Sequence, residues 1–343
     1  MAVKKLVLMM TVVAMWTSAA AQLKIKLADV DTIYHPSISG TVRGKFEYQT
    51  EEGESRFMVR NARLAVSGNV VKMVSYKAEI DLCDEGSIKM LDAYVRVSPL
   101  KNGRFTIGQF RVPFTIDAHR SPHTQYFANR SFIAKQAGNI RDVGAAIGYT
   151  FPLAMPITIE AGIFNGSGLT GQKDYWTNRV NYSAKLQFKP LSDIAIVLST
   201  QSISPNKKPV YMHDAGVSLT PGRWLLEAEY LYKHYKNNAF KDAHAVNAMV
   251  GYFIPVNKAV RTISLLGRYD MLTDHSNGTL DENGNMTLTD SKRHRATAGV
   301  TLSLGSKFQS DIRVNFEKYF YPDNAMVKPS EKDKLVVEFM VHF

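Results

Sequence analysis

The sequence has very little cysteine and few long hydrophobic runs. Cys83 is the single cysteine among 343 residues, which excludes an intramolecular disulfide framework and any metal site built only from thiolates. Beyond the first 21 residues no run of about 18 apolar residues occurs, so no transmembrane helix is predicted. Linkers, low-complexity tracts and motifs for a bound cofactor are also lacking. The sequence therefore predicts one domain without a cofactor.

The first residues have the pattern of an export signal. Lys4 and Lys5 precede an apolar run over residues 6–16, and residues 19–21 are alanines. This run is too short to span a bilayer as a helix, which takes about 20 residues, and the alanines suit a signal peptidase. We predict a signal peptide over residues 1–21 and a mature chain over residues 22–343. The alternative is a buried N-terminal helix.

The chain carries an excess of positive charge. Its 42 Lys and Arg outnumber 31 Asp and Glu, which gives a formal net charge of +11, and only two of these cations lie in the first 21 residues. Such an excess favours an anionic partner. Because an export signal is present, nucleic acid is not expected to be that partner.

Segments with strict alternation of apolar and polar residues follow one another along the mature chain. At the C-terminus Leu335 and Phe343 share one face, opposite Glu338 and His342, as in a half-apolar strand. Sixteen such strands are predicted, at 37–49, 55–69, 71–82, 87–98, 104–113, 139–150, 156–165, 177–189, 192–204, 209–220, 222–236, 242–253, 260–271, 291–304, 307–320 and 331–343.

The predicted connections alternate between short and long. Short ones contain Pro or Gly, as at Pro190 and Pro255, whereas 166–176, 274–291 and 321–332 are long and polar. Short turns on one rim and long loops on the other are typical of outer-membrane barrels. We predict an all-β fold, a closed transmembrane antiparallel β-barrel of about 16 strands. A soluble sandwich or propeller, the alternative, has no need for this regular alternation of connections or for charged inner faces.

We further expect Phe343 on the lipid face and both chain ends on the short-turn rim.

Five short motifs occur in a characteristic order. They lie at 57–64 (FMVRNARL), 91–94 (LDAY), 103–114 (GRFTIGQFRVPF), 141–144 (RDVG) and 162–166 (GIFNG). In this order they resemble the phosphate- and polyphosphate-selective porins, the porin O/P family of bacterial outer-membrane channels, over residues 36–190. The resemblance implies a homotrimer in the outer membrane and a third loop that folds into the lumen. Asn61 follows Arg60 where the family tends to pair two arginines, which predicts modest phosphate affinity.

The longest connection in the N-terminal half runs over residues 114–138 and is the third on the long-loop rim. It carries Arg120, Arg130 and Lys135 against one acid, Asp117. We expect this segment to lie in the lumen and narrow it. The alternative is a surface loop whose basic residues meet lipid phosphates. Its two histidines do not predict a metal site, because a loop gives their spacing no fixed geometry.

Alternation also assigns basic residues to the inner wall. Arg43 and Lys45 fall on the inner face of the first strand, whereas Arg60 and Arg63 both face inward only if a β-bulge lies near Asn61. Inner faces carry carboxylates too, so pairing of any one wall arginine with an acid stays open. Further arginines expected on inner faces are Arg96, Arg179, Arg268, Arg293, Arg295 and Arg313. The predicted anion-binding and pore-lining residues are Arg43, Lys45, Arg60, Arg63, Arg111, Arg120, Arg130 and Lys135.

These observations predict an outer-membrane porin for passive, anion-favouring diffusion of small solutes, with phosphate or polyphosphate-like anions as candidates. Expected partners are small anions, outer-membrane lipid and further copies in a homotrimer, with no metal and no nucleic acid. Two alternatives stay open. One is a non-conducting structural or adhesive barrel. The other is a lipid hydrolase, which would need a lipid-facing Ser/His pair that the clearest strands do not show; the prediction is therefore not an enzyme.

Overall fold

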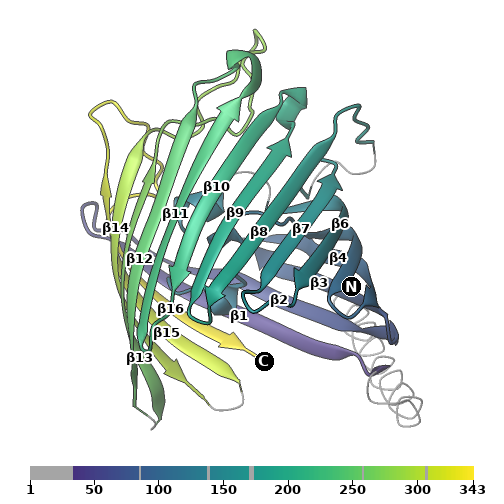
Figure 1. The fold of residues 1–343 in the computed structure, drawn as a ribbon. Helices are drawn as coiled ribbons and strands as arrows, with labels where there is room; N and C mark the ends of the chain where they lie inside the picture. Colours follow the sequence, from purple (N-terminus) through teal and green to yellow (C-terminus); the bar gives the residue numbers. More distant parts are fainter. Residues whose placement is uncertain (1–33, 85, 137–139, 170–173, 257–258, 306–307) are drawn as a thin grey trace, which may run out of the picture.

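The protein is described by a computed structural model over residues 34–343, except 85, 137–139, 170–173, 257–258 and 306–307. The predicted signal peptide lies outside the described residues. Sixteen antiparallel strands form one closed barrel, in which each strand pairs with its neighbours in sequence and β1 pairs with β16 (Figure 1). The predicted all-β barrel is confirmed. Closure leaves no strand edge without hydrogen-bond partners, as a bilayer requires.

The strands coincide with the predicted segments to within four residues at each end. They are β1 (Ser37–Gln49), β2 (Ser55–Val71), β3 (Val74–Asp84), β4 (Ser87–Leu100), β5 (Gly103–Arg111), β6 (Arg141–Phe151), β7 (Ile157–Phe164), β8 (Asn181–Leu191), β9 (Ile194–Ile203), β10 (Val210–Leu219), β11 (Trp224–Tyr235), β12 (Ala243–Pro255), β13 (Val260–Leu272), β14 (Arg293–Leu304), β15 (Gln309–Phe320) and β16 (Lys334–His342).

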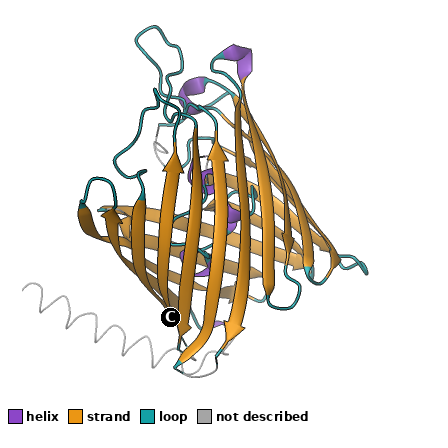
Figure 2. Cartoon of the chain, turned by 90° about the vertical axis from the view of Figure 1, so that its left-hand side faces the viewer, coloured by secondary structure: helices purple, strands orange, loops and turns teal. Residues whose placement is uncertain are grey.

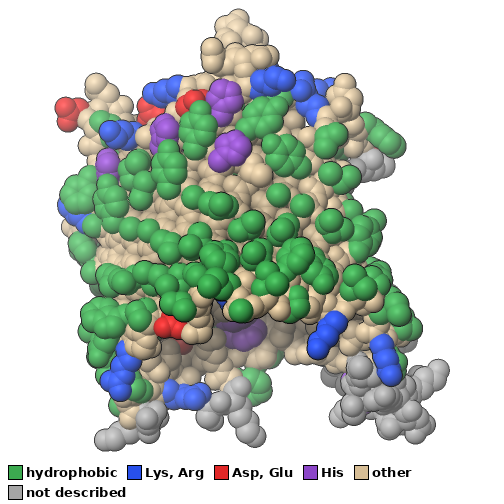
Figure 3. All heavy atoms as spheres, in the orientation of Figure 1, with side chains coloured by type: hydrophobic (Ala, Val, Ile, Leu, Met, Phe, Trp, Pro, Cys, Tyr) green, Lys and Arg blue, Asp and Glu red, His purple; other side chains and the backbone are tan. Residues whose placement is uncertain are grey.

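Side-chain alternation separates a lipid face from an inner face. In β11, Trp224 and Tyr230 are 49% and 45% exposed on the outside, whereas Glu227 and Glu229 are buried inside. Hydrophobic side chains accordingly cover the outer surface in a broad band (Figure 3). Within the described residues, no helix has the length and apolar character needed to cross a membrane.

The barrel closes where β1 meets β16. The backbone N–H of Gly40 donates to the Phe343 carbonyl at 2.8 Å, and the Phe343 N–H donates back at 3.0 Å. A Cβ on Gly40 would lie 2.4 Å from Cζ of Phe343, so glycine makes room for this ring. Phe343 is 47% exposed on the lipid side. The seam runs on to the pairing of Gln49 with Lys334, and its Gly40–Phe343 end lies at the short-turn rim, where the first strand was expected to begin and the last to end.

Long loops gather at one rim and short turns at the other (Figure 2). Residues 112–140, between β5 and β6, are called the third loop below. The short helices are η2 (Asp117–His119), η3 (Pro122–Thr124) and α2 (Phe132–Gln136) in the third loop, η4 (Pro205–Lys207) and η5 (Lys236–Asn238).

Part of the barrel interior is apolar, which differs from the predicted polar lumen. Phe132 and Ile133 of the third loop pack in one buried cluster with the wall residues Met212 and Leu231 and with Met286 from the loop between β13 and β14. Leu231 lies on the same inner face as charged residues of β11. The cluster also takes in Phe110 of β5, Phe164 of β7 and Tyr319 of β15, so an apolar core fills part of the interior.

Candidate pore constriction

The third loop crosses the interior and is bonded to opposite sides of the wall. Near its start, the Ser183 hydroxyl of β8 donates to the Pro113 carbonyl at 2.9 Å. Further along, Nη2 of Arg43 in β1 donates to the Ala128 carbonyl at 2.7 Å. Figure 2 shows the short helices of this loop inside the barrel. The third loop thus occupies the lumen and narrows it.

Asp117 holds the third loop together. Its carboxylate accepts hydrogen bonds from the Ser131 hydroxyl at 2.6 Å and the Ser131 N–H at 3.1 Å, and it forms an ion pair with Arg120 at 3.2 Å. Burial on its own would raise the pKa of Asp117, but Arg120, Arg130 and Ser131 outweigh it and lower the pKa to about 2. The carboxylate is therefore ionised at neutral pH and fixes the turn around it.

Two further contacts fasten the loop to the wall. Nη1 of Arg120 donates to Glu227 of β11 at 2.8 Å. The His123 ring stacks on the His342 ring of β16, with centroids 3.7 Å apart and an interplanar angle of 9°. Burial, reinforced by positive neighbours, lowers the pKa of His123 to about 4. His123 is therefore neutral at pH 7, which suits a stacked pair.

Arg111 and Arg130 converge on one backbone oxygen. Nη1 of Arg111 and Nη2 of Arg130 each donate to the Arg120 carbonyl at 2.8 Å. Nη1 of Arg111 also donates to the Ala118 carbonyl at 3.1 Å, whereas its Nη2 is buried without a hydrogen-bond partner among the described residues. Among those same residues, no ion pair joins either guanidinium to a carboxylate. Two cations that form no ion pair within the described residues thus stand side by side in the lumen.

More arginines surround this pair. Burial lowers the pKa of Arg130, and repulsion from Arg63, Arg43 and Arg141 lowers it further. The attraction of Asp117 opposes this shift only in part, so the pKa falls to about 9. The guanidinium therefore keeps its charge at neutral pH and interacts with all three neighbouring arginines. The constriction cluster, as used below, consists of Arg43, Arg63, Arg111, Arg130 and Arg141.

Arg141 was not among the predicted pore residues. Its Nε donates to Asp92 at 2.7 Å, and its Nη2 lies 3.6 Å from Glu79. It begins β6, directly after the third loop. Two features of the sequence could have identified Arg141 as a pore residue. It begins the motif at 141–144, and it lies next to the loop expected to narrow the lumen.

The other predicted pore residues are close to carboxylates. This bears out the alternative that wall cations are paired with acids, with Arg111 and Arg130 as the exceptions among the eight. The pairs are Arg43–Glu338 at 2.6 Å, Lys45–Glu47 at 3.8 Å, Arg60–Asp84 at 2.6 Å, Arg63–Asp81 at 2.9 Å, Arg120–Glu227 and Lys135–Glu331 at 3.4 Å. The expectation for Arg179 was wrong: it is exposed in the loop before β8 rather than on a strand.

The β-bulge near Asn61, on which the inward placement of both Arg60 and Arg63 was made conditional, is present in β2. Arg43 pairs in register with Asn61 and Gly44 pairs with Val59, so Arg60 is the extra residue. Beyond the bulge, Asn61 and Arg63 both donate to one carboxylate, Asp81. Because of this extra residue, Arg63 joins Arg43 on the inner wall.

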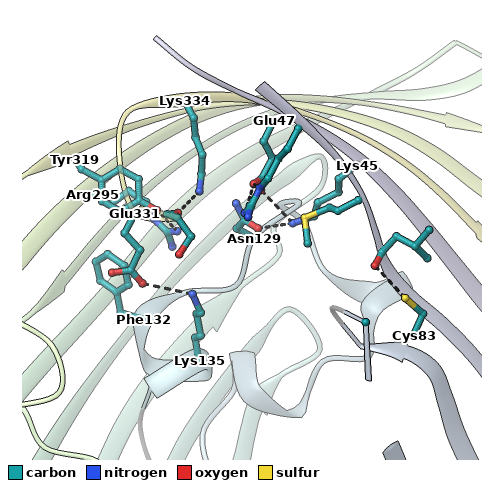
Figure 4. A pocket seen from close by; sticks show the side chains of 15 residues that line it. Lys45, Glu47, Cys83, Asn129, Phe132, Lys135, Arg295, Tyr319, Glu331 and Lys334 are labelled. Carbon is teal, nitrogen blue, oxygen red and sulfur yellow. Dashed lines mark hydrogen bonds and ion pairs between the residues drawn. The ribbon is translucent and has the colours of Figure 1, made fainter. Parts of the chain in front are cut away.

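Two cavities lie against the third loop and both are rich in cations. The larger has a volume of about 570 Å³ and includes Asn129, Phe132 and Lys135 of the loop (Figure 4). Its other charged lining residues are Lys45, Arg56, Arg295, Lys334, Glu47 and Glu331. The smaller has a volume of about 220 Å³ and includes Pro113 and His119 of the loop. Its charged lining residues are Lys77, Arg96, Arg104, Arg111, Asp92 and Glu160.

The site has no features of a metal centre. In the described part of the chain, His, Cys, Asp and Glu form no group of three that could hold a metal ion.

The comparisons agree with this geometry. Residues 40–199 match the family model described as phosphate-selective porin O and P, which confirms the resemblance. No curated protein matches the chain. Similar solved structures are the anion-selective porin from Comamonas acidovorans (TM-score 0.60, 13% identity, 90% of this chain and 98% of that chain), OmpF of Salmonella typhi with daunomycin (0.61, 11%, 91% and 98%) and OmpT of Vibrio cholerae in its trimer form (0.57, 13%, 90% and 98%).

Identities this low establish the fold alone, and the family match adds the kind of protein. The barrel, the loop across its lumen and the family match together show a bacterial outer-membrane porin, whose residues 40–199 are similar to the phosphate-selective porins O and P.

Proposed function

We propose that this porin conducts small solutes passively and favours anions, with phosphate or polyphosphate-like anions as the candidate class. The observation that carries the proposal is the pair formed by Arg111 and Arg130. Both lie half-buried in the lumen and are bonded to backbone carbonyls, and within the described residues neither forms an ion pair with an acid. An anion that passes the third loop supplies the opposite charge.

The physical setting strengthens the effect of these two charges. A narrow pore with low-dielectric walls concentrates the field, so a local cation excess raises anion occupancy more than the average charge of the wall. Arginine suits phosphate because its planar fork can donate two parallel hydrogen bonds. The cation-rich cavities on the two sides of the loop provide weak sites in series, which conduction needs because an ion must also leave.

Phosphate affinity is expected to be modest. Asn61 stands where the related family tends to have a second arginine, and its side chain is engaged with Arg43 and Asp81. It accepts from Arg43 and donates to Asp81, so it adds no positive charge to the constriction.

The working assembly is proposed to be a homotrimer. The OmpT structure in its trimer form shares the fold, and the outer surface of this barrel has an apolar hollow of about 410 Å³ at Gly44, bordered by Phe46, Phe57 and Phe339. Phe57 is 84% exposed there, and such a patch suits a neighbouring copy. The mass of the purified porin in detergent tests this directly, and a monomer would contradict it.

The function is tested by the reversal potential of the purified porin in a planar bilayer under a KCl gradient. The wild type should show an anion-favouring potential, and Arg111→Gln/Arg130→Gln should shift it towards zero or towards cations. The matched control is Arg223→Gln/Arg261→Gln, which removes two exposed arginines at the short-turn rim and should leave the potential unchanged. A cation-preferring wild type would refute anion preference. Absence of conductance would favour the structural or adhesive alternative.

A further inference from the structure

Four histidines lie on the lipid-facing surface close to the long-loop rim. They occupy β10, β11, β12 and β14, within four residues of the strand end at that rim, and their inner-facing neighbours are buried. Figure 3 shows histidine side chains gathered below the upper edge of the barrel, next to hydrophobic side chains. The belt, as used below, consists of His213, His234, His244 and His294 with Tyr230, Tyr232 and Tyr269.

Two of these histidines are bonded to tyrosines in the same way. The Tyr230 hydroxyl lies 2.8 Å from Nδ1 of His244, and the Tyr269 hydroxyl lies 2.6 Å from Nδ1 of His294. Where the phenol donates to Nδ1, Nε2 of the neutral ring carries the N–H. Neither Nε2 is hydrogen-bonded to another described residue. Each pair therefore presents one unused ring nitrogen on the outside of the barrel, which is a donor in this tautomer and in the protonated ring.

Lysines without acidic partners lie directly beyond the belt. In the loops of the same sector, and counting described residues only, no ion pair involves Lys207, Lys208, Lys236 or Lys292. Two acids at this rim are already bound, Asp242 to His234 at 2.9 Å and Asp274 to Lys241 at 2.5 Å. Other acids, Asp281 and Glu282, lie at the tip of the loop between β13 and β14. The surface next to the belt is therefore positive.

The opposite sector of the barrel differs. At the same rim, the outer face of β2–β7 presents apolar side chains such as Val59, Leu82, Met90 and Ile163, which are between 49% and 62% exposed. Every histidine of the chain is described by the structure, and none lies on that surface. The combination of imidazole, phenol and ammonium groups is thus confined to β10–β14 and their loops.

We propose that the belt and its four lysines bind the phosphate groups of an anionic glycolipid in the outer leaflet. Aromatic residues with a polar tip locate at head-group depth, which places the rings at the level of lipid phosphates. Lysines next to the membrane attract anionic head groups, and Nε2 of His244 and His294, when protonated, adds directed hydrogen bonds. Charge complementarity therefore selects a phosphorylated lipid for this sector.

The test measures binding of two lipids to the intact porin in detergent by native mass spectrometry: a diphosphorylated lipid A and its enzymatically dephosphorylated form. The wild type should retain the phosphorylated lipid preferentially. Lys207→Gln/Lys208→Gln/Lys236→Gln/Lys292→Gln should reduce that preference by about tenfold or more, because each membrane-proximal lysine contributes to attraction of anionic lipid. His244→Phe/His294→Phe, which keeps the ring size, should reduce it by a few-fold.

Three controls keep the outcome interpretable. Lys101→Gln/Lys189→Gln removes exposed lysines at the short-turn rim and should leave the preference intact. His234→Phe should have less effect than the double variant, because Asp242 already binds His234. Channel conductance should stay unchanged throughout, since all these residues lie outside the lumen. Equal retention of both lipids by the wild type, or an equal loss in the short-turn control, would overturn the proposal.

Discussion

Arg111 and Arg130 donate to the same oxygen, the backbone carbonyl of Arg120, at 2.8 Å each. A neutral carbonyl can hold two guanidinium groups in place without cancelling their charge. This differs from Arg43 and Arg63, which are held by carboxylates. Acids therefore hold Arg43 and Arg63 on the wall, whereas backbone carbonyls position Arg111 and Arg130, the two charges proposed to meet the passing solute.

Arg111→Lys should distinguish the effect of the positive charge at this position from the effect of the planar guanidinium group. The reversal potential in KCl should stay near the wild-type value, because the positive charge is kept. Block of chloride current by added phosphate should weaken several-fold, since an ammonium group cannot present the two parallel donors of a guanidinium. Current recordings at increasing phosphate concentration measure this. A variant blocked by phosphate as strongly as the wild type would show that Arg111 acts as a point charge only.

Asp117→Asn should loosen the third loop. The change removes the ion pair to Arg120 and weakens the two bonds from Ser131, at a cost of about 2–4 kcal/mol to the loop conformation. We expect noisier and larger single-channel currents and faster tryptic cleavage after Arg120 and Arg130. Asp281→Asn, in an exposed loop tip, is the control and should leave both unchanged. Currents as quiet as those of the wild type would contradict the anchoring role of Asp117.

Acidification should lower the stability of the folded protein, because it protonates His123, whose ring stacks on His342. Its pKa in the folded protein is lowered to about 4, below the unfolded value of about 6.5. Between these values the unfolded chain binds more protons, so stability rises with pH and is lost as pH falls from about 6.5 to 4. We expect a loss of ~1 kcal/mol after allowing for solvent screening of this half-buried ring.

Urea midpoints at pH 7 and pH 4 measure this dependence. His123→Phe keeps a ring against His342 but cannot titrate, so its midpoint should fall less between the two pH values. If the wild type and the variant lose stability in parallel, another group carries the pH dependence.

The buried pair of Arg43 and Glu338 should show strong coupling in stability. Arg43→Gln leaves the Glu338 carboxylate, which is fully buried, without this partner, and should cost about 3–5 kcal/mol. Arg313 also contacts Glu338 at 2.9 Å and reduces the loss to the lower end of that range. The double variant Arg43→Gln/Glu338→Gln should cost less than the sum of the single changes in urea unfolding. Strict additivity would show that the two side chains do not stabilise one another.

The sequence predicts the barrel well because its signal is local. Alternation over 334–343 or 222–236 depends only on neighbouring residues, and each such segment became a strand. The bulge at Arg60 was predictable for the same reason, since the parity of Arg60 and Arg63 needs one extra residue. Arg179 shows the limit, because the strand was expected to start before it, whereas β8 begins at Asn181.

The electrostatics of the site could be predicted only in part because they depend on distant partners. Arg43 meets Glu338 across 295 positions of sequence, and Arg120 meets Glu227 through a loop that crosses the lumen. Composition indicates a positive chain but not which charges remain uncompensated. The buried apolar cluster inside the barrel was not predicted. Met212 and Leu231 stand beside charged residues on the inner faces of their strands, and those charges indicated a polar lumen.

The third loop bears on how the barrel is assembled. Pro122 and His123 contact Arg313 and His342 in the last two strands, while Ala128 contacts Arg43 in the first. The loop therefore contacts strands on both sides of the β1–β16 seam. A chain whose seam is still open does not hold β1 and β16 in the arrangement that allows both sets of contacts, so we expect completion of the cylinder and full seating of the third loop to be coupled.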